Sequence, residues 1–299
     1  MMAIMSEMTS TLRILEPYPG IFAYYDGRMP GKRLHAKTAN WLDEGAYSLG
    51  VASYAIVDQG EALIYDTHIS LSHAKAIRTH LEGLGVKKIR VVLSHWHKDH
   101  IAGNAIFSDC EMIALTLTAE KLKENREKIE SADPPISPLI MPTTLFDGQF
   151  DLTVGRRRIE LHHFAIHSAD GNVIWLPEER LLLAGDTLED TVTYISEAAE
   201  IGTHIGELAR MASWPIAKIL PAHGDAERIA AGGYGPDLID ANRAYLRRMA
   251  GAIAAGQDID PSLKSLVAEE IASGAVLYFA PYEEVHASNI AAVKAALQR

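Results

Sequence analysis

The chain has 299 residues, of which 48% are hydrophobic, and its 39 acidic and 28 basic residues give a net charge of −11. Nucleic acid is therefore a disfavoured partner, because affinity for a phosphate backbone comes from clustered Lys and Arg. The sequence has neither an apolar run of about 18 residues nor a signal-like N-terminus, so we expect a cytoplasmic protein without a membrane partner.

The N-terminal region, residues 1–44, is expected to be a loop region ahead of the folded core. Its segment 28–37 contains Gly and Pro, which suit a surface loop. A solvated loop and an anion-attracting lid over a pocket both fit this segment, whose basic residues are Arg28, Lys32, Arg33 and Lys37. Aromatic residues in and near this region either pack in the core or line an apolar pocket, namely Tyr24, Tyr25, Trp41 and Tyr47.

The next segments alternate between strand and helix patterns. Apolar runs at 54–57 and 62–65 flank Asp58-Gln59-Gly60 and predict a hairpin. Either Ser70 or Ser72 is placed to cap a helix that ends near Gly85 and carries apolar residues at helical spacing. The β-branched run at 89–93 then predicts a buried strand.

A group of polar side chains follows that strand directly. The sequence His95-Trp96-His97-Lys98-Asp99-His100 places three imidazoles and a carboxylate within six residues. Extended backbone puts residues i and i+2 on the same side, so His95 and His97 can face one point. Imidazole nitrogen and carboxylate oxygen are ligands that zinc and its first-row neighbours prefer. The motif therefore indicates a metal site at the end of a strand.

The second half of the chain repeats the alternation. Thr118 is placed to cap a charged helix, and four prolines between 134 and 142 mark a long loop. Apolar patterns predict strands at 150–154, 159–161, 173–176, 181–184 and 218–220, with a helix that begins near residue 201. Such a mixture favours two packed sheets with helices outside. Three polar residues each end a short apolar run and precede a small or turn-forming residue: His167, Asp186 and His223.

After His223 the pattern changes to helices. Leu238, Ala241, Tyr245 and Met249 share one predicted helix face. This tail could cover the sheets, wall a pocket or form a subunit interface, and a homo-oligomer stays among the expected forms.

In this order, the polar residues resemble the motifs of the metallo-β-lactamase superfamily, over roughly residues 45–225. The resemblance implies a four-layer αββα sandwich with metals at one edge, as a single domain over 1–299 with a C-terminal helical extension over 226–299. Asp66 matches the family's first motif and would orient a ligand rather than bind metal. The implied ligands are His95, His97 and His167 for one metal, Asp99, His100 and His223 for the second, and Asp186 as the bridge.

The resemblance also implies a dinuclear zinc hydrolase, with iron or manganese as alternative metals. Two divalent ions about 3.5 to 4 Å apart can turn a bridging water into a hydroxide nucleophile. Asp99 is the expected catalytic proton carrier, because it is both a ligand and a carboxylate beside that water. The expected partner is a small-molecule substrate, namely an ester, a lactone or an amide.

Some positions depart from the zinc β-lactamases. The segment 167–177 is similar to theirs and contains Asn172 as a candidate substrate contact, but His100 and Asp186 replace an arginine and a cysteine. Leu188-Glu189-Asp190 follows Asp186 where those enzymes carry a lysine for the drug carboxylate. The alternatives are β-lactamase-like activity, an iron-dependent redox enzyme, or a metal-binding protein without catalysis.

Overall fold

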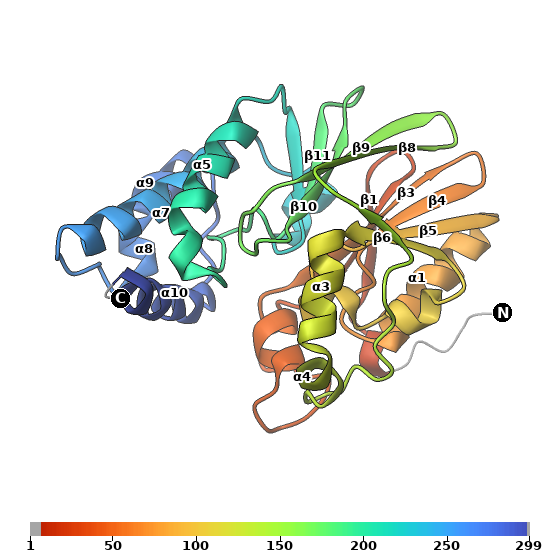
Figure 1. The fold of residues 1–299 in the computed structure, drawn as a ribbon, viewed down its shortest axis with the longest axis horizontal. Coiled ribbons are helices and arrows are strands. Elements are labelled where there is room, and N and C mark those ends of the chain that lie inside the picture. The colour runs from red at the N-terminus through yellow and green to blue at the C-terminus, as the bar shows by residue number, and fades with distance from the viewer. Residues whose placement is uncertain (1–6, 298–299) are drawn as a thin grey trace.

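The computed structural model describes residues 7–297, which form two β-sheets with helices on their outer sides (Figure 1). The strands of the first sheet lie side by side in chain order. Neighbours are antiparallel up to β4 and parallel from there on. The strands are β1 (Arg13–Tyr18), β2 (Ile21–Asp26), β3 (Val51–Asp58), β4 (Glu61–Tyr65), β5 (Lys88–Val92), β6 (Glu111–Leu115) and β7 (Thr144–Phe146).

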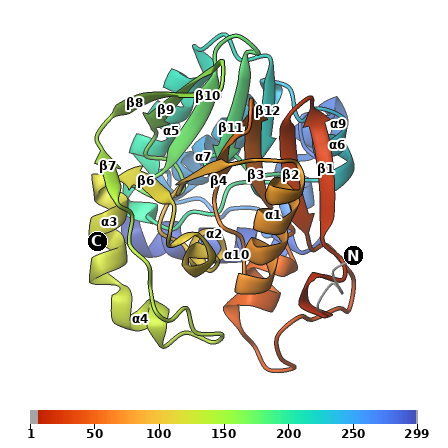
Figure 2. The same ribbon diagram turned by 90° about the vertical axis from the view of Figure 1, so that its right-hand side faces the viewer.

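The second sheet has the strand order β12-β11-β10-β9-β8. Its strands pair antiparallel except for β11 and β12, which are parallel. Figure 2 shows the two sheets one above the other. The strands are β8 (Gln149–Val154), β9 (Arg157–His163), β10 (Asn172–Leu176), β11 (Leu181–Gly185) and β12 (Lys218–Pro221).

Helix α1 (Leu71–Gly83) covers the outer face of the first sheet and buries Ile77 and Leu81 against it. Of the two candidate N-caps, Ser70 is the cap, because its hydroxyl accepts a hydrogen bond from the His73 N–H at 3.3 Å. The other elements of this half are η1 (Glu7–Thr9), η2 (Trp41–Tyr47), α2 (Lys98–Ile101), η3 (Asn104–Phe107), α3 (Thr116–Glu124) and α4 (Arg126–Glu130).

The helices α5 and α7 lie on the side of the second sheet, α7 to α10 extend beyond it (Figure 1), and α6 packs against β1 and β2. The predicted face with Leu238, Tyr245 and Met249 is buried, so this tail covers the sandwich. Within residues 7–297 we find no helix with the length and apolar character needed to cross a membrane. The elements are η4 (Ala198–Glu200), α5 (Ile201–Ala212), α6 (Ala226–Ala230), α7 (Asp237–Ala254), α8 (Leu263–Leu266), α9 (Ala268–Ser273) and α10 (Tyr282–Leu297).

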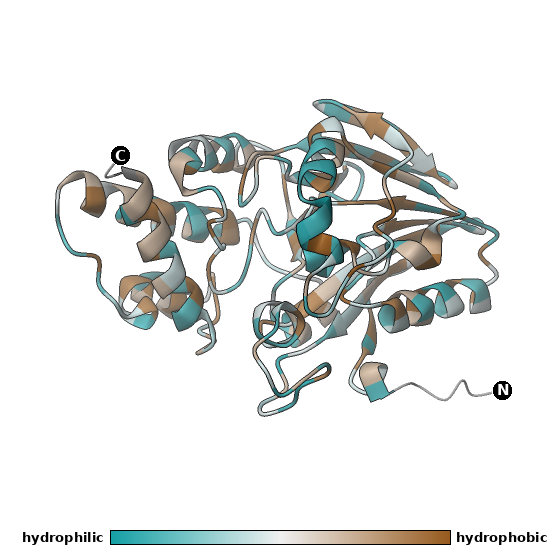
Figure 3. Cartoon of the chain, turned by 60° about the horizontal axis from the view of Figure 1, so that its bottom comes forward, coloured by the Kyte–Doolittle hydropathy of each residue, from teal (hydrophilic) through white to brown (hydrophobic). Residues whose placement is uncertain are grey.

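The main hydrophobic core lies between the sheets and continues beneath the C-terminal helices. Tyr54 and Leu63 of the first sheet belong to the same buried cluster as Leu161 and Ile174 of the second. Figure 3 shows hydrophobic strands inside and mixed hydropathy on the helices, as expected for helices with one buried face. The expected αββα sandwich with C-terminal helices is thereby confirmed.

Two expectations about local structure need correction. Residues 1–44 are not only loop, because β1 and β2 add two strands to the first sheet, and all six residues of β2 are buried. A strand covered on both faces has no alternation of polar and apolar residues, so its pattern is easily missed. Thr118 is not a cap either: it lies inside α3, and its hydroxyl donates to the Asp170 carbonyl at 3.5 Å.

Candidate metal centre

The candidate metal ligands lie on loops that follow strand ends of both sheets. The loop after β5 carries residues 95–100 and leads into α2. Asp186 follows β11 and His223 follows β12, and because these strands are parallel, both residues lie at the same sheet edge. Gly185 has φ of +53°, and a Cβ there would lie 2.8 Å from the Tyr65 hydroxyl. Glycine before Asp186 therefore allows the close approach of the two sheets at this edge.

Asp186 lies at the centre of a group of imidazoles. Its Oδ2 is 3.1 Å from Nε2 of His100 and 3.5 Å from Nε2 of His223. The same oxygen is 3.6 Å from Nε2 of both His95 and His167. One carboxylate oxygen thus faces four ring nitrogens that come from both sheets.

The ligand atoms form two groups that share Asp186, and within each group they lie within 4.8 Å of one another. Nδ1 of His97 lies 2.9 Å from Nε2 of His167, so a proton or a cation is needed between these two nitrogens. The geometry fits a dinuclear site. The first group consists of His95, His97, His167 and Asp186, and the second of Asp99, His100, Asp186 and His223.

Hydrogen bonds on the outer side of the rings determine which nitrogen faces the centre. Nδ1 of His223 lies 2.6 Å from the Gly50 carbonyl, and Nδ1 of His167 lies 2.9 Å from the Tyr194 carbonyl. Because a carbonyl oxygen can only accept, Nδ1 donates in both rings, and in the neutral ring the lone pair is on Nε2. Such outward bonds are typical of metal-binding histidines.

Asp66 performs the same task for His100. It is 1% exposed, and its Oδ2 accepts from Nδ1 of His100 at 2.8 Å while its Oδ1 accepts from the Ser94 N–H at 2.7 Å. Both Asp66 and His167 have φ of 66°, in the left-handed region, where a residue other than glycine costs about 1–3 kcal/mol. Asp66 is not a member of either ligand group, and its contacts suit a residue that orients a ligand.

Unpartnered atoms and charge both support a metal pair here. Among the described residues, His95 Nε2 and Asp186 Oδ1 are buried without a hydrogen-bond partner. Burial opposes charge on His100 and His223, but the neighbouring Asp186 and Asp99 outweigh burial and raise the pKa of both histidines well above its usual value. The carboxylates therefore require positive charge nearby, which divalent ions would supply.

A buried carboxylate that the sequence analysis did not assign lies behind His167. Glu189 is 1% exposed, and its Oε1 is 3.5 Å from Nδ1 of His167. The same Oε1 accepts from the Tyr194 N–H at 2.8 Å, and Oε2 accepts from the Tyr282 hydroxyl at 3.0 Å. Because Tyr282 begins α10, the C-terminal extension contacts the metal centre through Glu189.

The same extension holds the loop after Asp186 by its backbone. The Asn242 side chain of α7 accepts from the Thr193 N–H at 2.8 Å. The Asn289 side chain of α10 accepts from the Ile195 N–H at 2.8 Å and donates to the Thr193 carbonyl at 3.0 Å. The carbonyl that orients His167 therefore belongs to a segment that the C-terminal helices hold on both sides.

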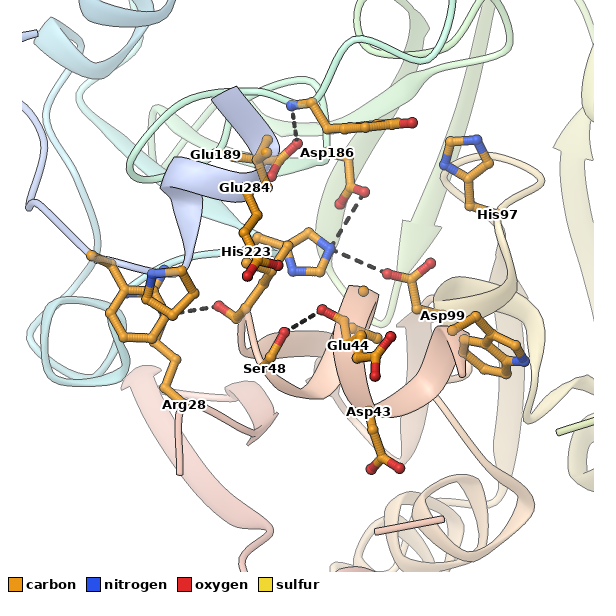
Figure 4. Close-up of a pocket in the computed structure, with 18 of the residues that line it drawn as sticks. Arg28, Asp43, Glu44, Ser48, His97, Asp99, Asp186, Glu189, His223 and Glu284 are labelled. Atoms are coloured by element: carbon orange, nitrogen blue, oxygen red, sulfur yellow. Dashed lines mark hydrogen bonds and ion pairs between the residues drawn. The ribbon is translucent and has the colours of Figure 1, made fainter. Parts of the chain in front are cut away.

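The ligand cluster opens into a pocket of about 940 Å³, a size that suits a small molecule. Figure 4 shows His223 between Asp186 and Asp99, with Glu44 on one side and Glu284 on another. The walls are the loop 28–33, the segment 41–49 that includes η2, and the start of α10.

Several candidate substrate contacts lie outside this pocket. Tyr24 lies on the outer face of the first sheet, where its hydroxyl is 2.9 Å from Nδ1 of His80. The Tyr25 hydroxyl donates to the Gly224 carbonyl at 3.1 Å, and the Tyr47 hydroxyl lies 3.0 Å from the Thr11 hydroxyl. Neither tyrosine lines the pocket. The Asn172 amide donates to two carbonyls of the metal-ligand loop at 2.7 and 2.8 Å. These four side chains are part of the core and do not line the pocket, which corrects that expectation.

Trp41 lines the pocket, and so does the first part of the basic segment. The cations of this segment mostly bond to their own surroundings. Arg28 donates to the carbonyls of Leu49 and Asp190, and Lys32 donates to the Ser10 hydroxyl at 2.8 Å. These contacts hold the loop in place at the pocket wall.

Other lining residues had weaker or no signals in the sequence. Trp96 and Lys98 lie between the predicted ligands and line the pocket, so their place in the motif could have indicated them. Phe279 and Glu284 come from the C-terminal extension, far along the chain. No local pattern marks such residues, because only the packing of α10 brings them to the site.

Comparison with curated proteins finds a relative over part of the chain. The Beta-lactamase-like protein 2 homolog of Caenorhabditis elegans is 26% identical over 180 residues, which are 60% of this chain and 55% of the relative. The chain thus spans about half the length of this curated relative.

Solved structures share the fold. The DIM-1 metallo-beta-lactamase exposed to ceftazidime is 22% identical, with a TM-score of 0.55 over 72% of this chain and 90% of that chain. The metallo-beta-lactamase from Pontibacter korlensis is 16% identical, with a TM-score of 0.61 over 79% of this chain and 99% of that chain. A sequence profile described as the Metallo-beta-lactamase superfamily matches residues 47–227, a range that includes both ligand groups. The chain belongs to the metallo-beta-lactamase superfamily.

Proposed function

We propose that this protein is a dinuclear, zinc-dependent hydrolase of a small ester, lactone or amide. The observation that carries the proposal is the set of four imidazole Nε2 atoms that surround Asp186 Oδ2 at 3.1 to 3.6 Å. Two nitrogen-rich ligand groups that share one carboxylate suit a pair of zinc ions.

We assign the residues around the centre to two roles, metal binding and proton transfer. Bound there, two divalent ions would lower the pKa of a water between them and polarise the substrate carbonyl. Asp99 is the group best suited to move a proton, because its side chain is 16% exposed and lines the pocket. Asp186 is only 4% exposed and enclosed by imidazoles, so we assign it to holding the site together.

Two considerations support esters and lactones over β-lactams as substrates, namely the segment after Asp186 and the ordinary order of leaving groups. Glu189 and Asp190 follow Asp186 and are buried, so this segment offers no cation to the carboxylate of a β-lactam. Alkoxides and phenoxides are better leaving groups than amide nitrogens. We therefore expect esters and lactones to react faster than penicillins or carbapenems.

Metal analysis together with a substrate panel tests the proposal. The purified protein should hold about two zinc ions per chain, and kcat/KM should be highest for activated esters and lactones. Asp186→Ala should lower zinc content and turnover together. The control Asp151→Ala, at a residue 52% exposed on β8, should leave both unchanged.

Other results would contradict the proposal in distinguishable ways. Iron in place of zinc, with no hydrolysis of any panel member, would favour a redox enzyme. A β-lactam that reacts faster than every ester would overturn the substrate class and leave the metal assignment intact. Full activity of Asp186→Ala with one metal per chain would refute the bridging role.

A further inference from the structure

Lys98 differs from the other cations that line the pocket. Among the described residues its side-chain ammonium has no hydrogen bond and no ion pair, although Lys98 is half-buried and lies between His97 and Asp99 in the chain. Arg28 and Lys32 donate to neighbouring groups, and Arg33 pairs with Glu44 at 3.2 Å. The Lys98 ammonium is therefore the lining cation that is free to bind a ligand.

Aromatic side chains flank this cation. The Lys98 ammonium lies 5.8 Å from the centre of the Trp41 ring, within the range of a cation–π contact. The Trp41 indole N–H donates to the Pro134 carbonyl at 2.8 Å, which fixes the ring in the pocket wall. Trp96 also lines the pocket, with its ring centre 4.9 Å from that of His97. An apolar surface and a free positive charge thus lie beside the metal ligands.

Of the carboxylates that line the pocket, Asp99 attracts the Lys98 ammonium, but Asp99 belongs to a metal-ligand group. The carboxylates outside the ligand groups are paired elsewhere or exposed. Glu44 pairs with Arg33, and Asp43 accepts hydrogen bonds from the backbone of the loop at 34–36. Glu284 has no hydrogen bond or ion pair through its side chain within residues 7–297, but it is exposed and belongs to α10. Water therefore screens Glu284 more than the half-buried Lys98.

We propose that Lys98, with Trp41 and Trp96, binds a carboxylate on the substrate, so that the preferred substrate is an ester or lactone that carries a second, anionic group. This inference rests on the proposed hydrolase function and adds the charge of the substrate to it. Lys98 acts by binding and not in the chemical step, so its effect should fall on KM more than on kcat.

The test compares two esters that differ only in a distant group, a carboxylate in one and its neutral primary amide in the other. With the zinc-loaded protein, kcat/KM should be higher for the carboxylate, and Lys98→Gln should lower it about tenfold for that ester alone, which corresponds to about 1.4 kcal/mol. Lys98→Arg should restore most of the preference. Lys218→Gln, at an exposed lysine at the start of β12 outside the pocket, should leave the preference unchanged.

Binding of 3-phenylpropanoate gives a second measurement that does not depend on turnover. Titration calorimetry should show weaker binding to Lys98→Gln than to the unaltered protein, with a smaller dependence on salt. An equal loss for both esters, or unchanged binding of 3-phenylpropanoate, would overturn the role of Lys98. A preference for an ester with a distant amine would overturn it as well. Absence of hydrolysis of every ester by the zinc-loaded protein, with Lys98-dependent binding of 3-phenylpropanoate retained, would instead refute the hydrolase function.

Discussion

Three imidazoles of the centre, those of His100, His167 and His223, have a hydrogen-bond acceptor on their outer side. Backbone carbonyls accept from Nδ1 of His167 and His223, whereas His100 has the carboxylate of Asp66. A side-chain carboxylate can be changed by mutation and a backbone carbonyl cannot. Substitution of Asp66 therefore tests how these outer hydrogen bonds affect metal binding.

Asp66→Asn should weaken zinc binding about 10- to 100-fold while the protein stays folded. Asp66 now accepts at both oxygens, from Ser94 N–H and His100 Nδ1. An asparagine that keeps the Ser94 bond directs its NH₂ at Nδ1, which favours the His100 tautomer with the proton on Nε2 and removes the lone pair from the centre. Competition with a chelator measures the affinity. Equal zinc affinity in Asp66→Asn and in the exposed control Asp151→Asn would contradict the orienting role.

At the scale of elements, α10 connects the C-terminal extension to the metal centre. Glu189 is a buried carboxylate that accepts hydrogen bonds from the Thr193 hydroxyl, the Tyr194 N–H and the Tyr282 hydroxyl. A protein loses folding free energy when a buried carboxylate loses one of its hydrogen-bond donors. Removal of the Tyr282 hydroxyl on α10 therefore tests how much this contact contributes to stability.

Tyr282→Phe should lower the free energy of unfolding by about 1–3 kcal/mol and also weaken zinc binding, because the Glu189 carboxylate loses its hydroxyl donor. The matched control is Tyr278→Phe, whose hydroxyl bonds the Glu283 carboxylate at 3.0 Å near the surface. Urea unfolding with a zinc competition assay measures both quantities. Similar losses in the two variants would show that Tyr282 has no special link to the centre.

Asp43 binds the backbone of residues 34–36, which follow the pocket-lining loop 28–33. Its carboxylate accepts from the N–H groups of Leu34 at 2.6 Å and Ala36 at 3.1 Å and from the Asn40 amide at 2.9 Å. Burial alone would raise the pKa of Asp43, but these hydrogen bonds outweigh burial and lower it. The ionised form is therefore the one that stabilises the loop.

Stability from Asp43 should depend on pH with a defined sign. Because its folded pKa is lowered, the contribution is complete above the ordinary aspartate pKa of about 3.9 and is lost as the pH falls through the folded value. Asp43→Asn should thus destabilise the metal-free protein at neutral pH, and the difference from the unaltered protein should shrink below about pH 4. Chemical denaturation across pH measures this difference. A difference that stays constant from neutral to acid pH would contradict the assignment.

For the whole molecule, the metal centre lies where the two sheets meet. The ligands on 95–100 follow a strand of the first sheet, and His167, Asp186 and His223 follow strands of the second. Metal bound there joins both halves of the sandwich and favours the folded chain by mass action.

Zinc should therefore raise the thermal midpoint of unfolding. At a free zinc concentration about 100 times the dissociation constant, the gain in folding free energy is about 2.7 kcal/mol per site if the unfolded chain does not bind zinc. A chelator should reverse the shift, and Asp186→Ala should show a smaller one. Scanning calorimetry with and without zinc measures it. A midpoint that does not change with zinc would mean that the folded state binds the metal no better than the unfolded chain does.

The sequence by itself determined the sandwich and the polar residues that meet in it. Ligands that follow strand ends within short motifs can be found from residue type and spacing, as His95, Asp99 and Asp186 show. The Ser70 cap and the hairpin before Asp66 could be found in the same way, because both depend on neighbours in the chain.

Only the tertiary structure decided which aromatic and charged residues face the pocket. Tyr24 and Trp41 look alike as candidates in the sequence, but the pleat of β2 turns Tyr24 toward α1 while Trp41 lines the pocket wall. Glu189 and Tyr282 are 93 residues apart in the chain and meet only because α10 packs against the loop after Asp186. Contacts of this kind depend on how whole elements pack, and local spacing carries no record of that packing.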